Sequence, residues 1–168
     1  MKKLILFALS VALLLSGCTS TDGTGNFKLF LTDQPIENAD EIWVTISEIN
    51  VHKEELGFFT LSQGEQKFDL LTLLNTEVLV LSKTLEAGTY TQIRLVVSEG
   101  AIVIDDVTYP MTVPSSEVKI PLVFIVMDED NIEVVLDFEA DESVDVVYTA
   151  EGNEYILNPV IRVKSITH

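Results

Sequence analysis

The chain has 168 residues, enough for one domain and rarely two, and 47% of them are hydrophobic. Its formal net charge of -17 at pH 7 predicts an acidic surface that repels nucleic acid and anionic lipid headgroups, so we expect no nucleic-acid partner. A single cysteine allows no internal disulfide and no CxxC metal or redox motif, so the core must hold without crosslinks.

The N-terminus has the pattern of a secretory signal. Two lysines precede an apolar run over residues 4–15, and two small residues then lead to Cys18. The run is about a dozen residues long, which is short of the ~20 that a membrane-spanning helix needs. Residues 15–18 (LSGC) resemble the lipobox of bacterial lipoproteins. By that resemblance, the thiol of Cys18 receives a diacylglyceryl group and the signal is cleaved after Gly17.

We therefore expect three segments: a lipoprotein signal peptide over residues 1–17, a lipidated Cys18 with a flexible polar tether over 18–25, and a single domain over 26–168. Removal of the two signal lysines from a net charge of -17 leaves about -19 on the mature chain. Two or more acyl chains hold a protein durably to a bilayer. The expected location is thus the cell membrane or outer membrane, facing the periplasm or the exterior. An ordinary cleaved signal with a chance cysteine is the alternative.

From Asn26 onward, short β-branched and aromatic runs alternate with turn residues, which is typical of an all-β sandwich or barrel. In the first run, Phe27, Leu29 and Leu31 recur at every second position and predict a strand with one buried face. In the second run, over residues 42–51, the apolar parity switches near residues 47–48, which predicts a β-bulge there. We expect about nine to eleven strands in total.

Two local features are expected between residues 68 and 97. Residues 68–74 (FDLLTLL) predict one short helical turn near residues 69–75, with Asp69 as its N-cap. Residues 85–90 (LEAGTY) predict a tight turn, and a glycine two positions before Tyr90 is typical of a tyrosine corner, whose hydroxyl bonds back to the turn backbone. Strict alternation in the strand that follows places Tyr90 on the face opposite to Ile93.

Two further turns shape the expected C-terminal half. The polar residues 128–131 (DEDN) lie between Val126 and Ile132 and predict a β-hairpin. Residues 155–163 predict a last strand, in which Pro159 requires an edge position or a bulge because proline donates no ladder hydrogen bond.

Asp137, Glu139 and Asp141 form an acidic cluster. The first two share a strand face because strand side chains repeat every two residues, and Asp141 can curl into the same region if the strand ends near residue 140. Crowded carboxylates repel one another, and a hard cation such as calcium relieves that repulsion. With Asp33, at the end of the first strand, these acids are the candidate metal ligands, and no other cofactor is expected. The alternatives are a solvated strand face and, for Asp33, a turn-stabilising role.

Few features of the sequence indicate catalysis, and we assign no catalytic residue. The two histidines, His52 and His168, lie in no metal-ligand spacing such as HExxH, and the serines at 115 and 116 lack a GxSxG elbow. A hydrolase with two paired carboxylates remains an alternative, although abundant acids make each pair uninformative. Aromatic residues could form a sugar-stacking platform if exposed, or could pack in the core. They are Trp43, Phe58, Phe59, Tyr109 and Tyr148.

The chain contains, in order, the stretches GNFKLFLTDQP (25–35), WVTISEINVH (43–52), FDLL (68–71), AGTYTQIRL (87–95), VPSS (113–116), LDFEA (136–140) with Ser143, and YILNPVIRV (155–163). Together they resemble the bacterial and archaeal family labelled domain of unknown function 4382, found largely in secreted proteins and lipoproteins. Glu139 replaces a common aspartate and Ser116 a frequent glycine. The resemblance implies an immunoglobulin-like or transthyretin-like antiparallel β-sandwich, and no established activity.

The sequence therefore predicts a lipid-anchored, cell-envelope β-sandwich that acts as a non-catalytic binding or structural module for an envelope polysaccharide or protein partner. That hypothesis predicts an exposed apolar or aromatic patch, or an open sheet edge. The alternatives are a calcium-stabilised structural sandwich and an envelope hydrolase that uses paired carboxylates.

Overall fold

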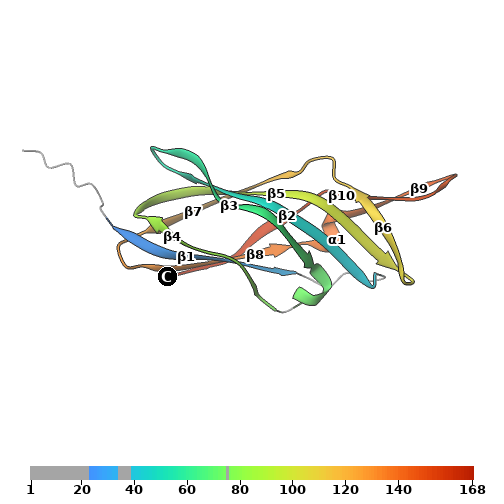
Figure 1. The fold of residues 1–168 in the computed structure, drawn as a ribbon, viewed down its shortest axis with the longest axis horizontal. Coiled ribbons are helices and arrows are strands. Elements are labelled where there is room, and N and C mark those ends of the chain that lie inside the picture. Colours follow the sequence, from blue (N-terminus) through green and yellow to red (C-terminus); the bar gives the residue numbers. More distant parts are fainter. Residues whose placement is uncertain (1–22, 34–38, 75) are drawn as a thin grey trace, which may run out of the picture.

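A computed structural model describes residues 23–33, 39–74 and 76–168, and within them eleven strands form two stacked sheets (Figure 1). The expected all-β sandwich is therefore confirmed. The signal segment, Cys18 and most of the expected tether lie outside the described residues. Among the residues that are described, no helix has the length and apolar character needed to span a membrane.

The smaller sheet consists, in spatial order, of β11 (Ile161–Thr167), β8 (Asn131–Phe138), β1 (Thr24–Asp33) and β4 (Val78–Glu86). β1 pairs with β4 antiparallel but with β8 parallel. The sandwich is thus mixed at this position rather than wholly antiparallel. The parallel pair is possible because the chain passes through the other sheet between β1 and β8.

The larger sheet has the spatial order β3 (Gly57–Asp69), β2 (Glu41–Lys53), β5 (Gly88–Ile104), β6 (Val107–Thr112), β10 (Gly152–Leu157) and β9 (Val144–Thr149), with β7 (Glu117–Val126) also paired to β5. β5 is long enough to pair with β7 along its first half and with β6 along its second half. The short β10–β6 pairing is parallel.

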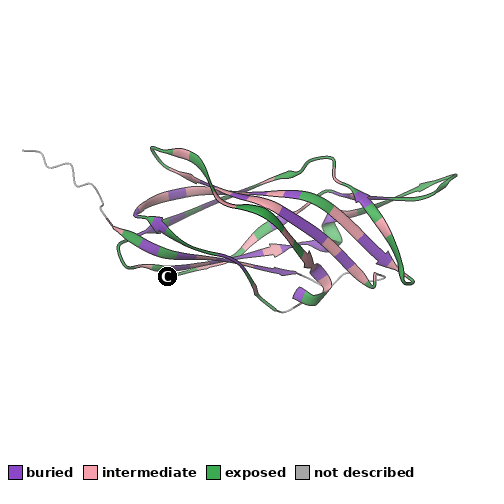
Figure 2. Ribbon diagram, in the orientation of Figure 1, coloured by how far each residue is buried: buried purple, intermediate pink, exposed green. Residues whose placement is uncertain are grey.

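The core lies between the two sheets, where the strands place every second side chain (Figure 2). Phe27, Leu29 and Leu31 of β1 are buried, as the alternation predicted. The ring of Phe124 stacks between Phe27 and Tyr90, with centroid distances of 5.3 Å and 5.0 Å. This aromatic stack joins the smaller sheet to the larger one through dispersion and apolar burial.

The predicted local features of the second and third strands are confirmed. The register of β2 shifts between Ile46 and Glu48 against both neighbours, which is the expected bulge. A 3-10 turn, η1 (Leu70–Leu73), follows β3, and its N-cap Asp69 accepts a hydrogen bond from the backbone of Leu71 at 3.2 Å. A second helical turn, α1 (Ala140–Ser143), was not predicted.

The tyrosine corner is also present, but its strand alternates differently from the expectation. The Tyr90 hydroxyl donates to the carbonyl oxygen of Glu86 at 3.0 Å. The register of β5 against β7 shifts between Tyr90 and Gln92. Because this bulge inserts one residue, Tyr90 and Ile93 both point into the core rather than to opposite faces.

Two expectations for the C-terminal half are wrong. Residues 128–131 do not close a hairpin, because β7 belongs to the larger sheet and β8 to the smaller one. Residues 155–163 do not form one strand, because β10 ends at Leu157 and β11 begins at Ile161 in the other sheet. Pro159 lies in the connection between these sheets, where no ladder hydrogen bond is required of it.

The sandwich has two distinct ends (Figure 1). The first described residue, Gly23, accepts a hydrogen bond from the backbone of Ala87 in the β4–β5 turn, and Thr24 accepts one from Glu129 in the β7–β8 turn. We call this the tether end. At the opposite end, the β9–β10 hairpin extends beyond the remaining strands.

Candidate functional site

The four predicted metal ligands lie in the smaller sheet or beside it. Asp33 ends β1 with only 4% of its surface exposed, and its Oδ1 atom accepts a hydrogen bond from the backbone of Ala140 at 3.2 Å. This hydrogen bond ties β1 to α1, whereas the turn that Asp33 was expected to stabilise lies outside the described residues. Asp137 lies in β8, opposite Thr32 of β1 and Arg162 of β11.

Arg162 neutralises part of this acidic region. Its guanidinium contacts the Glu139 Oε1 atom at 2.8 Å and the Glu142 Oε2 atom at 2.6 Å. The hydrogen bond to Glu142, followed by the one to Glu139, raises the pKa of Arg162 above its usual value. Glu139 is only 8% exposed, so this partner offsets the cost of burying its charge. The arginine therefore supplies positive charge that reduces the repulsion between these carboxylates.

Ser143 fastens α1 to the end of the sheet. Its hydroxyl donates to the carbonyl oxygen of Glu139 at 2.6 Å and accepts from the backbone of Val160 at 2.9 Å. Sequence reasoning did not assign roles to Ser143 or Arg162. Both residues were among those that carried the family resemblance. No neighbouring residue in the sequence indicated that Ser143 would contact Val160 or that Arg162 would contact Glu139.

Calcium binding stays a prediction. In the described part of the chain, no three His, Cys, Asp or Glu side chains are grouped in a way that could hold a metal ion. Asp141 is exposed on α1, whereas Asp33 and Glu139 are buried. The four acids therefore differ in surroundings even though they lie near one end of the same sheet.

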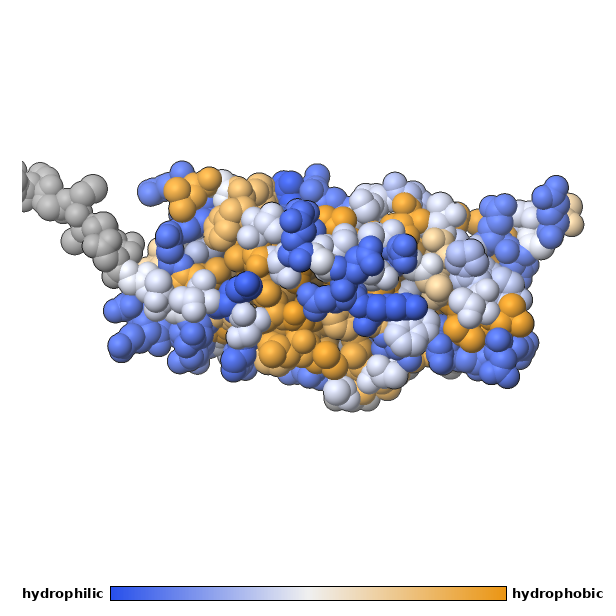
Figure 3. All heavy atoms as spheres, in the orientation of Figure 1, coloured by the Kyte–Doolittle hydropathy of each residue, from blue (hydrophilic) through white to orange (hydrophobic). Residues whose placement is uncertain are grey.

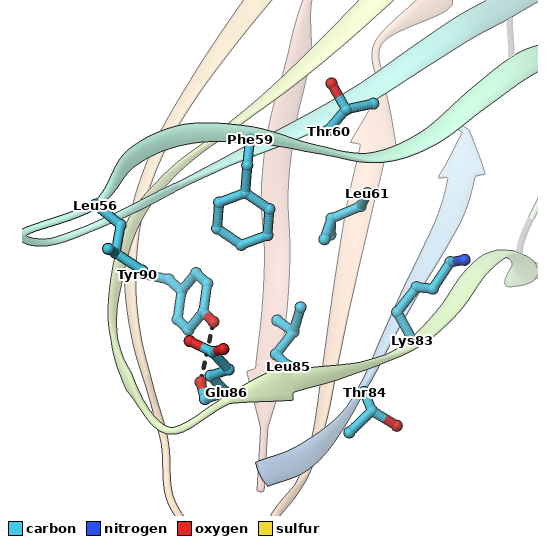
Figure 4. Close-up of a pocket in the computed structure, with 9 residues that line it drawn as sticks. All are labelled: Leu56, Phe59, Thr60, Leu61, Lys83, Thr84, Leu85, Glu86 and Tyr90. Atoms are coloured by element: carbon cyan, nitrogen blue, oxygen red, sulfur yellow. Dashed lines mark hydrogen bonds between the residues drawn. The ribbon is translucent and has the colours of Figure 1, made fainter. Parts of the chain in front are cut away.

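A cavity opens between the edge strands β3 and β4, where the two sheets separate (Figure 4). It has a volume of about 500 Å³, within the range of small-molecule sites. Apolar atoms are visible between flanking polar side chains on the face drawn in Figure 3. The lining residues are Leu56, Phe59, Thr60, Leu61, Lys83, Thr84, Leu85, Glu86 and Tyr90.

Tyr90 forms the floor of this cavity. Its ring lies 6.4 Å from that of Phe59 in an edge-to-face arrangement. Burial, and secondarily the charge of Glu86, raises the pKa of Tyr90 to about 12. The hydroxyl is therefore neutral at physiological pH and is occupied by its corner hydrogen bond. Glu86 itself pairs with Lys53 at 3.0 Å.

The β9–β10 hairpin forms a second exposed feature, which we call the distal ribbon (residues 144–157). β9 is the terminal strand of the larger sheet, and only Tyr155 and Ile156 of β10 also pair with β6. Val146, Val147 and Tyr148 are 38%, 40% and 81% exposed. Because successive side chains alternate, these residues expose apolar surface on both faces of the ribbon.

The aromatic residues do not gather into one platform. Trp43 lies in β2 with the Lys67 ammonium 4.6 Å from its ring centroid, and Tyr109 lies in β6 against Tyr155 at 5.2 Å. Phe58 and Phe59 are neighbours on β3, and Tyr148 lies in the distal ribbon. Five aromatics on four strands provide separate contacts rather than a continuous stacking surface.

The comparisons with known proteins identify the family. A family model described as "Domain of unknown function (DUF4382)" matches residues 24–159. No curated protein and no solved structure matches the chain significantly. The matched residues run from the first residue of β1 to the connection after β10, which is well over half of the chain. The chain therefore belongs to the DUF4382 family.

Proposed function

We propose that this chain is a lipid-anchored lipoprotein of the cell envelope whose sandwich is a non-catalytic binding module for a protein partner. The observation that carries this proposal is the distal ribbon. It presents a terminal strand, β9, and exposes the apolar side chains of Val146, Val147 and Tyr148.

The ribbon would gain stability from a partner. A two-stranded hairpin is marginally stable in water, and residues 152–154 pair with β9 alone. An extended segment that adds to the edge of β9 would supply a third strand through main-chain hydrogen bonds. It would also cover the apolar side chains, each square ångström of which contributes about 25 cal/mol when removed from water.

The placement of the ribbon supports the same role. The described chain begins at the tether end, next to the β4–β5 and β7–β8 turns. Acyl chains on Cys18 would hold that end near the bilayer, since only residues 18–22 precede Gly23. The ribbon, at the opposite end, would then face the envelope and its proteins (Figure 1).

The hydrolase alternative depends on where the carboxylates lie. A carboxylate-based hydrolase needs two carboxyl groups that face one cleft. The cavity between β3 and β4 is lined by one carboxylate, Glu86, which pairs with Lys53 at 3.0 Å, whereas Glu54 and Glu55 line a second cavity at the β2–β3 turn. Glu139, which is buried near α1, pairs with Arg162.

The anchor and the partner are tested separately. Metabolic labelling with radioactive palmitate should mark the wild-type chain and leave Cys18→Ala unlabelled. A photo-crosslinking amino acid at position 148, in living cells, should yield one discrete adduct that Val146→Lys and Val147→Lys each reduce. The control position is 119, an exposed residue of β7. If both positions yield the same adduct, or if position 148 yields no adduct, the ribbon is not the binding surface. If purified glycans block the adduct, the partner is a polymer instead.

A further inference from the structure

Lys83 occupies an unusual position for a charged residue. In the β1–β4 register it lies opposite Phe27, which is fully buried, so its side chain leaves β4 on the core-facing side, although Lys83 itself is exposed at the sheet edge. Figure 4 places it on the same side of β4 as Leu85, whereas Thr84 points the other way. Among the described residues, no ion pair involves Lys83, although its neighbour Glu86 is paired with Lys53.

An inward-pointing lysine at a sheet edge has a purely structural explanation. Such residues prevent edge strands from pairing with other chains, and β4 is an edge strand. That role requires only a charge at the edge. It does not require the cavity of about 500 Å³ beside the charge, or walls formed by Phe59, Leu61 and Leu85.

The cavity combines an apolar interior with one available cation. Phe59 and Leu61 of β3 face Leu85 of β4 across the gap, and the Tyr90 ring closes the floor (Figure 4). Lys83 lies at the margin of this apolar surface. An apolar pocket with one precisely placed charge is the arrangement that orients a ligand with an apolar body and an opposite charge.

We propose that the gap between β3 and β4 binds a fatty acid of about the length of dodecanoate, with the aliphatic chain against Phe59, Leu61, Leu85 and Tyr90 and the carboxylate at the Lys83 ammonium. Charge complementarity at Lys83 selects an anionic head over a neutral one. The net charge of the whole chain is -17, but exposed charges are screened beyond about 8 Å at physiological salt. Glu86, the carboxylate in the cavity lining, is paired with Lys53, so Lys83 is the local charge that decides the head group. This site is separate from the distal ribbon, so the inference goes beyond the proposed partner-binding function.

Matched ligands test this assignment directly. All core residues lie between Phe27 and Ile161, so residues 19–168 contain the whole domain. We would titrate this protein by calorimetry with dodecanoate and with dodecanol, both below their aggregation concentrations. One equivalent of dodecanoate should bind, and Lys83→Gln should weaken its affinity about tenfold or more. The same substitution should leave dodecanol binding unchanged.

Two variants separate the cavity from general charge effects. Lys119→Gln removes an exposed lysine of β7 and should not alter binding of either ligand. Leu61→Trp, which fills the cavity from β3, should weaken both ligands. Thermal melts check that each variant folds, and amide shifts at Phe59, Leu85 and Tyr90 in the wild-type protein report the site without any substitution.

Any one of five outcomes would overturn the proposal. The first is that dodecanoate shows no saturable binding. The second is that Lys83→Gln binds dodecanoate as tightly as wild type does, and the third is that this substitution weakens dodecanol binding as much as dodecanoate binding. The fourth is that the amide shifts are confined to other strands. Tighter binding of dodecyl phosphate than of dodecanoate, by tenfold or more, would also overturn it, because the ligand would then be a lipid phosphate head group.

Discussion

The tyrosine corner makes the stability of this domain sensitive to alkaline pH. Tyr90 is fully buried, and its pKa is raised from 10.0 to about 12 by burial and by the charge of Glu86. Between these two values the unfolded chain loses the phenolic proton while the folded chain keeps it. The folded state therefore binds more protons, and the free energy of unfolding falls as pH rises. The stabilisation is fully present below pH 10 and is lost as pH approaches 12.

The size of this effect follows from the pKa difference. A difference of two pH units corresponds to about 2.7 kcal/mol at full titration, because each unit is worth about 1.4 kcal/mol. At pH 11.5 roughly 2 kcal/mol of that should already be lost. Tyr90→Phe removes the titrating group, and at pH 8 it should cost about 1 kcal/mol through the missing hydrogen bond to Glu86.

Urea unfolding at pH 8 and pH 11.5, followed by far-ultraviolet circular dichroism at constant ionic strength, measures both effects. The decisive quantity is the difference between wild type and Tyr90→Phe. Tyr148→Phe is the matched control, since Tyr148 is largely exposed and should lose stability in parallel with wild type. If Tyr90→Phe loses as much stability between the two pH values as wild type does, the reasoning is wrong.

Three further predictions concern packing and the acidic region. Ser143→Ala should lower the free energy of unfolding by about 1–3 kcal/mol because it leaves the partly buried backbone N–H of Val160 without its acceptor. Ser82→Ala, at an exposed position of β4, should change it little, and urea unfolding compares the two variants. Gly25→Ala should cost about 1–3 kcal/mol in the same assay, because a Cβ atom there would lie 3.0 Å and 3.1 Å from two backbone carbonyl oxygens. If calcium binds the acidic cluster, calcium should raise the melting temperature, and Asp137→Asn and Asp141→Asn should each abolish that increase. Identical melts with calcium and with a chelator would rule out a calcium site there.

Much of the fold could be predicted because its causes are local. The every-second-residue recurrence of Phe27, Leu29 and Leu31 forces a strand with one buried face. Asp69 caps the turn that follows β3 because a short carboxylate side chain reaches the backbone two residues on. Gly88, two positions before Tyr90, likewise predicted the corner hydrogen bond from Tyr90 to Glu86. In each case the interacting groups lie within a few residues of one another.

The candidate sites were harder to predict because their parts come from distant segments. The sequence marked Glu139 as an acid in need of a cation, but its partner, Arg162, is placed there by the pairing of β11 with β8. The inward direction of Lys83 depends on its register opposite Phe27, which lies on another strand. Strand spacing alone cannot give that register, since it is set by which strands pair and where.

By itself the sequence determined the all-β class, the bulge in β2, the capped turn and the corner, because periodicity and backbone preference act within a few residues. Only the tertiary structure decided that β1 and β8 run parallel, that the chain changes sheets at residues 128–131 and 158–160, and that the edges of β3 and β4 stay apart. Those features arise from how two sheets cover one apolar core, and no single segment contains enough of that core to specify them.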